Sequence, residues 1–130
     1  MRKLRSGSDK IKSLEESMLK NKVILASSTQ LGRGDEQLGE NVLETFFTLL
    51  KQREDLPKAV FCMNSGVYLM TDESFVSVHL KELEEKGVNI LACKTCVDHY
   101  GLQEKITVGE ISTMGDFINL AAQHEVLTIS

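Results

Sequence analysis

Tryptophan is absent from the chain, proline occurs once, and only 5% of the 130 residues are aromatic. Proteins that bind single-stranded nucleic acid stack bases on aromatic side chains, so this composition disfavours such a platform. No apolar run approaches the ~20 residues that a membrane-spanning helix needs. The N-terminus also lacks the apolar core of a signal peptide. We therefore expect a cytoplasmic protein that binds neither nucleic acid nor membrane.

Cysteines are also few: Cys62, Cys93 and Cys96. An odd number without a signal peptide argues for a reducing compartment and against a disulfide framework. A zinc site needs four ligands, and beyond His99 the sequence offers no second closely spaced pair to complete one. We expect no bound metal and no cofactor. Cys62 lies among apolar neighbours and is predicted to be an unreactive core residue.

Charge is distributed unevenly along the chain, whose formal net charge is −4. Residues 1–22 carry seven Lys or Arg against three acidic residues, whereas the remainder carries eight against sixteen. An acidic body disfavours binding to a phosphate backbone. The length is typical of a single domain. We expect residues 1–22 to form a basic leader or linker helix and residues 23–130 to form one folded domain.

Apolar runs without alternation occur at 23–26, 59–63 and 88–92; a shorter candidate strand lies at 106–108, and a last one lies at 125–129. Such runs are typical of strands buried on both faces of a parallel sheet. Helical periodicity lies between them, at about 36–52, 73–86, 95–100 and from 113 onward. This alternation predicts a three-layer α/β/α domain with a mostly parallel sheet of about five strands.

Capping residues and apolar spacing predict where the long helices begin and which faces they bury. Asp35 is the expected cap of the first, Thr71 or Asp72 of the second, and Ser112 of the third. The predicted inward residues are Leu38, Val42, Phe46, Leu49 and Leu50 in the first helix, Val76, Leu80 and Leu83 in the second, and Met114, Phe117, Ile118 and Ala121 in the third.

Three unusual loops follow three of the expected strands. Parallel strands place such loops at one edge of the sheet, where ligands of open α/β sheets bind. The candidate site taken from these loops and the residues after them comprises Gly32, Arg33, Gly34, Asp35, Asn64, Ser65, Gly66, Cys93, Lys94, Thr95, Cys96, His99 and Tyr100.

The Cys93-Lys94-Thr95-Cys96 motif is the strongest candidate for chemistry. Cys93 ends a strand and Cys96 lies near the first turn of a helix, where partial positive charge favours a thiolate. Lys94 adds to the positive potential. The two thiols are one helical turn apart and could act as attacking and resolving groups, or could be two small buried residues.

The other loops have both a functional and a plain structural interpretation. Gly32-Arg33-Gly34-Asp35 could hold an anion through backbone N–H groups or could be a tight turn that requires positive φ. Asn64-Ser65-Gly66 could likewise donate hydrogen bonds or simply form a turn. His99 and Tyr100 could take part in proton transfer or could be ordinary packed or exposed residues.

These motifs, in this order, resemble the DsrE/DsrF-like sulfurtransferase family. The resemblance is greatest to the C-terminal domain of the YedF-type sulfurtransferase-like proteins of selenium metabolism and covers about residues 23–130. The motifs that carry it are Gly32-Arg33-Gly34-Asp35, Leu38-Gly39, Met63-Asn64-Ser65-Gly66-Val67, Leu80 to Val88, Cys93-x-Thr95-Cys96, Tyr100-Gly101-Leu102 and Val108-Gly109-Glu110-Ile111.

The resemblance implies a small domain with a parallel five-stranded sheet, often assembled as a homo-oligomer. It implies that Cys93, which stands eight residues before Gly101, accepts sulfur as a persulfide, and that Cys96 matches a second cysteine found in some members. The implied partners are sulfur-donor and sulfur-acceptor proteins, including a TusA-like domain.

The leading hypothesis is a sulfur-relay protein that carries a persulfide on Cys93 and passes it to a partner. One alternative is a thiol–disulfide redox protein that uses Cys93 and Cys96. Another is a non-catalytic oligomeric binding module in which the thiols are incidental.

Overall fold

The computed structural model describes residues 19–130, and the expected amphipathic helix of the leader lies outside them apart from its last residues. The strands are β1 (Lys22–Ala26), β2 (Ala59–Cys62), β3 (Asn89–Cys93), β4 (Glu110–Ser112) and β5 (Glu125–Ile129). The helices are α2 (Glu36–Leu50), the 3₁₀ helix η1 (Asn64–Met70), α3 (Val76–Glu85), α4 (Lys94–Tyr100) and α5 (Met114–Gln123).

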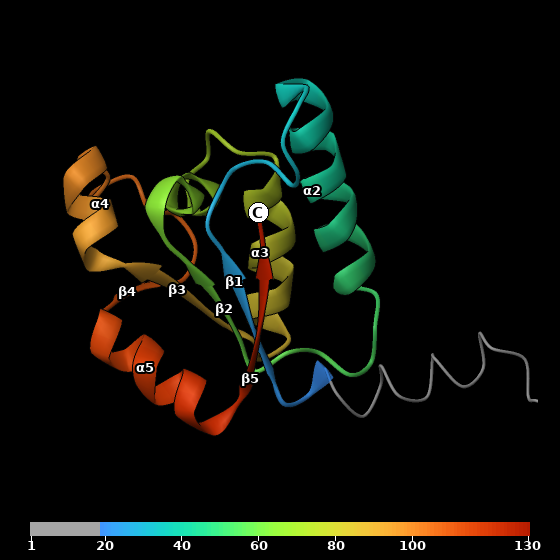
Figure 1. The fold of residues 1–130 in the computed structure, drawn as a ribbon, viewed down its shortest axis with the longest axis vertical. Coiled ribbons are helices and arrows are strands. Elements are labelled where there is room, and N and C mark those ends of the chain that lie inside the picture. The colour runs from blue at the N-terminus through green and yellow to red at the C-terminus, as the bar shows by residue number, and fades with distance from the viewer. Residues whose placement is uncertain (1–18) are drawn as a thin grey trace, which may run out of the picture.

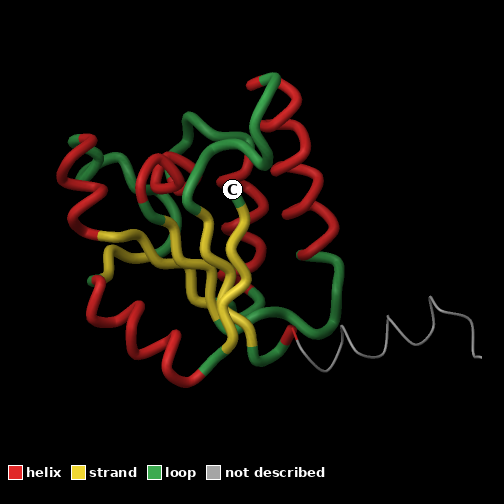
Figure 2. Tube along the Cα trace, in the orientation of Figure 1, coloured by secondary structure: helices red, strands yellow, loops and turns green. Residues whose placement is uncertain are grey.

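The five strands form one sheet in the order β4-β3-β2-β1-β5, and every neighbouring pair is parallel. α2 and α3 cover one face and α5 covers the other, which gives three layers (Figures 1 and 2). The prediction of a parallel five-stranded α/β/α domain is confirmed. Because all strands run the same way, the segments that follow β1, β2 and β3 leave the sheet at one edge.

The core is divided between the two faces of the sheet. The face under α2 and α3 holds the larger cluster, which includes Ile24, Val60, Ile90 and Leu80. The opposite face holds a smaller cluster of Val23, Ala59, Phe61 and Cys93, against which Phe117 and Leu120 of α5 pack. Cys93 therefore directs its side chain to the α5 face.

The predicted inward face of α2 is wrong at three of its five residues; Leu50 is buried as predicted, and Phe46 is partly buried against the core. Leu38, Val42 and Leu49 are exposed, whereas the buried residues are Gly39, Leu43, Phe47 and Leu50. Two apolar stripes run along this helix, one residue apart. Gly39 belongs to the buried stripe and packs closely against the loop after β1: a Cβ at this position would lie only 2.8 Å from the Cβ of Gln30. This close approach turns the stripe that contains Gly39 inward.

The two stripes of α2 are distinguished by adjacent substitutions. We expect Leu43→Ala to lower the free energy of unfolding by about 2–4 kcal/mol, because Leu43 is fully buried and its truncation leaves a cavity. Val42→Ala is the matched control and should cost less than about 1 kcal/mol, because Val42 is 39% exposed. Urea denaturation followed by circular dichroism measures both. Equal costs would contradict the observed face.

The fourth strand lies later than expected. Residues 106–108 do not join the sheet; Ile106 makes only an isolated antiparallel bridge to Thr71. Gly109 adopts φ +77°, and a Cβ there would lie 2.3 Å from the carbonyl oxygen of Ile90. The turn at Gly109 thus lets the chain pass close to β3 before β4 begins at Glu110.

Two predicted helix starts are also corrected. α3 begins at Val76, and neither Thr71 nor Asp72 caps it; the Ser74 hydroxyl accepts from the Val76 N–H instead. α5 is capped by Thr113, whose side chain accepts from the Asp116 N–H.

The predicted inward face is confirmed for α3 but only partly for α5. Val76, Leu80 and Leu83 are buried as predicted. In α5, Met114 and Ile118 are exposed and Ala121 is not buried, because α5 contacts the sheet through Phe117 and Leu120.

Candidate functional site

Cys93 and Cys96 lie at the edge of the sheet where β3 passes into α4. Cys93 is the last residue of β3 and the N-cap of α4, and only 3% of its surface is exposed. Cys96 is half-buried, one helical turn later, and contacts both core clusters. Both thiols are free. The strand-end placement agrees with the prediction, and it leaves Cys96 as the more accessible thiol.

Asn64 joins these cysteines from the end of the neighbouring strand. β2 pairs with β3, so the first residue of η1 lies beside the start of α4. The backbone N–H of Asn64 donates to Cys96 Sγ at 3.0 Å, and the Tyr100 hydroxyl donates to Asn64 Oδ1 at 3.0 Å. Cys93 in turn interacts with the Cys96 thiol. Asn64, Cys93, Cys96 and Tyr100 therefore form one connected group, which we call the thiol cluster.

The environment of Cys96 acts on its pKa in two directions. Burial, followed by interaction with the neighbouring Cys93 thiol, raises the pKa of Cys96, while the N–H of Asn64 lowers it. The net effect is a raised pKa, so the helix start does not make Cys96 the acidic thiol that the motif predicted. Formation of a thiolate on Cys96 therefore depends on the donors around its sulfur.

Cys62 is an unreactive core residue, as predicted. It is fully buried in β2, and burial raises its pKa to about 12. A thiol that cannot ionise near neutral pH is neither a nucleophile nor a metal ligand. Cys93 and Cys96 accordingly remain the candidates for thiol chemistry in this domain.

The glycine turn after β1 makes contacts away from the thiol cluster. Gly32 and Gly34 adopt φ +87° and +136°, and the N–H of Gly32 donates to the carbonyl oxygen of Ser130. Asp35 caps α2 by accepting from the Leu38 N–H, and Arg33 is exposed. Figure 1 shows this segment arching toward α2, on the side opposite α4. The contacts that Gly32 and Asp35 make are those of a structural turn.

Ser65 and Gly66 continue the η1 turn. Gly66 is buried, and a Cβ there would lie 2.1 Å from the carbonyl oxygen of Ala26, so η1 is seated directly on the end of β1. Ser65 lines a cavity of about 510 Å³ between α2, η1 and the start of α3. Glu40, Glu44 and Glu73 also line this cavity, which was not anticipated from the sequence.

The remaining predicted site residues lie on α4. Lys94 is exposed and forms an ion pair with Asp98 at 2.7 Å, which satisfies its charge. Thr95 is exposed. His99 is exposed and packs its ring edge against Tyr100, with ring centroids 4.9 Å apart. Through this ring contact, His99 lies beside Tyr100 of the thiol cluster.

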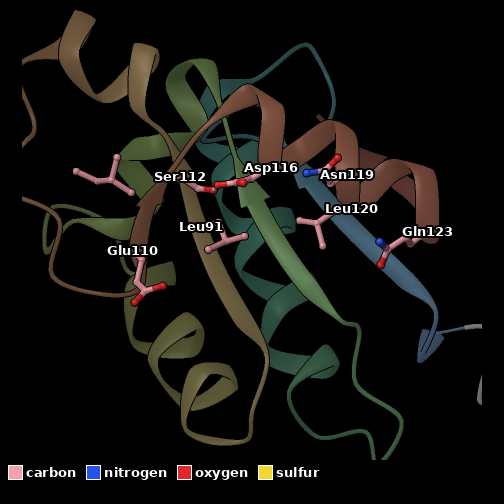
Figure 3. Close-up of a pocket in the computed structure, with 8 residues that line it drawn as sticks. Leu91, Glu110, Ser112, Asp116, Asn119, Leu120 and Gln123 are labelled. Carbon is pink, nitrogen blue, oxygen red and sulfur yellow. The ribbon is translucent and has the colours of Figure 1, made fainter.

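Sequence reasoning missed Ser112 as a neighbour of Cys93 and Asp116 as the hydrogen-bond partner of Ser112. Ser112 is the register partner of Cys93 across β3 and β4, and its hydroxyl donates to Asp116 Oδ2 at 2.8 Å. Figure 3 shows the two side chains directed toward one another. Both residues line a hollow of about 360 Å³ beside α5. Hydrogen bonds from Ser112 and then Thr113 lower the pKa of Asp116. The Ser-Thr-x-x-Asp pattern signalled a helix cap but not its closeness to a thiol.

Two further properties concern residues 19–130 as a whole. In this part of the chain, no helix combines the length and the apolar character needed to cross a membrane. The same residues contain no group of three or more His, Cys, Asp or Glu side chains placed to hold a metal ion.

Comparison with known proteins identifies the family of this chain. The model of the DsrE/DsrF-like family matches residues 20–129. The chain belongs to the DsrE/DsrF-like family. Its members are associated with sulfur relay. No curated protein matches the chain.

Solved structures share the fold of this DsrE/DsrF-like chain. The YchN protein from E. coli is 25% identical, with a TM-score of 0.64 over 84% of this chain and 98% of that one. MTH1491 from Methanobacterium thermoautotrophicum is 17% identical, with a TM-score of 0.59 over 82% and 97%. BT1422 from Bacteroides thetaiotaomicron is 19% identical, with a TM-score of 0.58 over 84% and 95%. The last two are described as proteins of unknown function, so their likeness concerns the fold alone.

Proposed function

We propose that this DsrE/DsrF-like protein is a sulfur-relay protein that carries a persulfide on Cys93. The observation that supports it best is the thiol cluster, in which two free cysteines and a backbone donor meet at the carboxyl edge of a parallel sheet. Membership of a family associated with sulfur relay gives independent support.

Loading and transfer are each an exchange at sulfur. In loading, the Cys93 thiolate attacks the outer sulfur of a donor persulfide; a new S–S bond forms on Cys93 and the donor leaves as a thiolate. In transfer, an acceptor thiolate attacks the same outer sulfur and Cys93 leaves as a thiolate. Neither step needs an external oxidant, because the sulfur keeps its oxidation level.

The burial of Cys93 determines how partners must approach it. Only 3% of the surface of Cys93 is exposed, whereas the neighbouring Cys96 is half-buried. We propose that donor and acceptor proteins, among them a TusA-like domain, bring their thiols to the α4 side of this edge. A buried persulfide is protected from solvent thiols between the two encounters.

Assembly and branch within the family are parts of the same proposal. We propose a homo-oligomer, because α2 and α5 expose apolar side chains on their outer faces, including Leu38, Leu49 and Ile118 at 59–60% exposure. Light scattering after gel filtration measures the oligomeric state.

The ordered motifs further support a YedF-type member of the family, with a basic leader before one domain at 23–130. A role in selenium metabolism would follow from that branch.

Persulfide loading tests the proposed function. Incubation with a persulfide donor should add one sulfur, about 32 Da, to the intact protein and to the peptide that contains Cys93. Addition of a thiol-bearing acceptor domain should then move this mass to the acceptor. A protein that takes up no sulfur but cycles between dithiol and disulfide would instead be a thiol–disulfide redox protein, which the contact between the two cysteines also favours.

A further inference from the structure

Asn64 has a backbone conformation that its neighbours must hold in place. Its φ is +51°, which makes it the one non-glycine residue among those described with a positive φ. This left-handed region costs free energy for a residue with a Cβ, although Asn tolerates it better than most residues. Such strain persists only where surrounding contacts fix it, and it gathers at functional sites.

Contacts to the Asn64 side chain and to the following residues of η1 hold Asn64 in this conformation. Its side-chain oxygen accepts from the Tyr100 hydroxyl at 3.0 Å, and the Tyr100 ring packs edge-on against Tyr68 of η1, with centroids 5.1 Å apart. Two residues later, Gly66 lies against β1 and anchors the other end of the turn. The result of this conformation is an N–H aimed at Cys96 Sγ at 3.0 Å.

We infer that Asn64 and Tyr100 are positioning residues for Cys96: Tyr100 fixes the side chain of Asn64, and Asn64 thereby holds its N–H on the Cys96 sulfur. This inference rests on the proposed function for its role in sulfur chemistry. The N–H favours the thiolate form of Cys96, which is the form that attacks the inner sulfur of a Cys93 persulfide. That attack forms the Cys93–Cys96 disulfide, breaks the bond to the outer sulfur and releases it as hydrosulfide.

Cys96 ionisation in the absence of any sulfur donor tests the inference. In a Cys93→Ser background Cys62 stays buried, so the pH dependence of alkylation by iodoacetamide reports Cys96. Tyr100→Phe removes only the hydroxyl that holds Asn64. We expect it to raise the pKa of Cys96 and to slow its alkylation about three- to tenfold at neutral pH, the effect of weakening one hydrogen bond to a charged group.

Two further variants separate positioning from general structure. Tyr68→Phe removes a hydroxyl from the ring that packs on Tyr100 and should leave the alkylation profile unchanged. Asn64→Gly keeps the N–H and tolerates the positive φ but loses the oxygen that Tyr100 holds, so it should act like Tyr100→Phe. Identical profiles for Tyr100→Phe and Tyr68→Phe would overturn the inference.

The alkylation experiment can fail or succeed independently of the persulfide-loading experiment that tests the proposed function. A shifted profile in Tyr100→Phe together with no persulfide uptake by the wild type would keep the positioning role and reject sulfur relay. Persulfide uptake by the wild type together with an unshifted alkylation profile in Tyr100→Phe would keep sulfur relay and reject the positioning role.

Discussion

Gly66→Ala is expected to lower the free energy of unfolding by about 3 kcal/mol or more, because the new methyl group meets backbone and not a flexible side chain. The added Cβ would lie 2.1 Å from the carbonyl oxygen of Ala26 and 3.2 Å from the amide nitrogen of Ser28. Either η1 must move off β1 or β1 must move out of the sheet. Because η1 begins with Asn64, the contact to Cys96 should be lost as well.

Gly115→Ala is the matched control for this substitution. Gly115 lies in the first turn of α5, and a Cβ there would have an ordinary contact of 3.6 Å with the Thr113 hydroxyl. Ala is the better helix former, so this variant should gain up to about 1 kcal/mol. Urea denaturation of both variants measures the difference. A Gly66→Ala protein as stable as the wild type would contradict the close packing of η1 on β1.

Cys96→Ser is expected to prolong the life of the persulfide on Cys93. In the wild type, Cys96 can attack the loaded Cys93, release hydrosulfide and leave the disulfide. A serine hydroxyl cannot do this, so loss of the added sulfur without an acceptor should slow by about tenfold or more. Time-resolved intact-mass measurement follows the loaded species.

The products provide the control for this prediction. The wild type should accumulate the Cys93–Cys96 disulfide as hydrosulfide appears, and Cys62→Ala should behave like the wild type because Cys62 is fully buried. Equal decay in wild type and Cys96→Ser would show that Cys96 has no resolving role.

The parallel sheet was predictable because its strands are short apolar runs separated by helical periodicity. That signal is local, and it also located the edge where Cys93 and Asn64 meet. The buried face of α2 was not predictable, since the stripes containing Leu38 and Leu43 are both apolar. Only contact with the loop after β1, through Gly39, selects one of them.

The contacts within the thiol cluster could not be predicted, because they join residues that are distant in sequence. Asn64 and Cys96 are 32 residues apart, and Asn64 and Tyr100 are 36 apart, so no spacing rule pairs them. The sequence indicated a turn at Asn64 but could not show its positive φ. The glycine turn was expected in the site because it follows a strand and could offer backbone N–H groups to an anion, yet the N–H of Gly32 donates to Ser130, which β5 brings alongside β1.

Intact mass after treatment with a persulfide donor tests the central claim most directly. The wild type should gain about 32 Da, Cys62→Ala and Cys96→Ser should gain the same, and Cys93→Ser should gain nothing. Cys93→Ser should melt close to the wild type, so that its failure to load reflects the missing thiol. A Cys93→Ser protein that gains the same mass, or a wild type that gains none, would contradict Cys93 as the sulfur carrier.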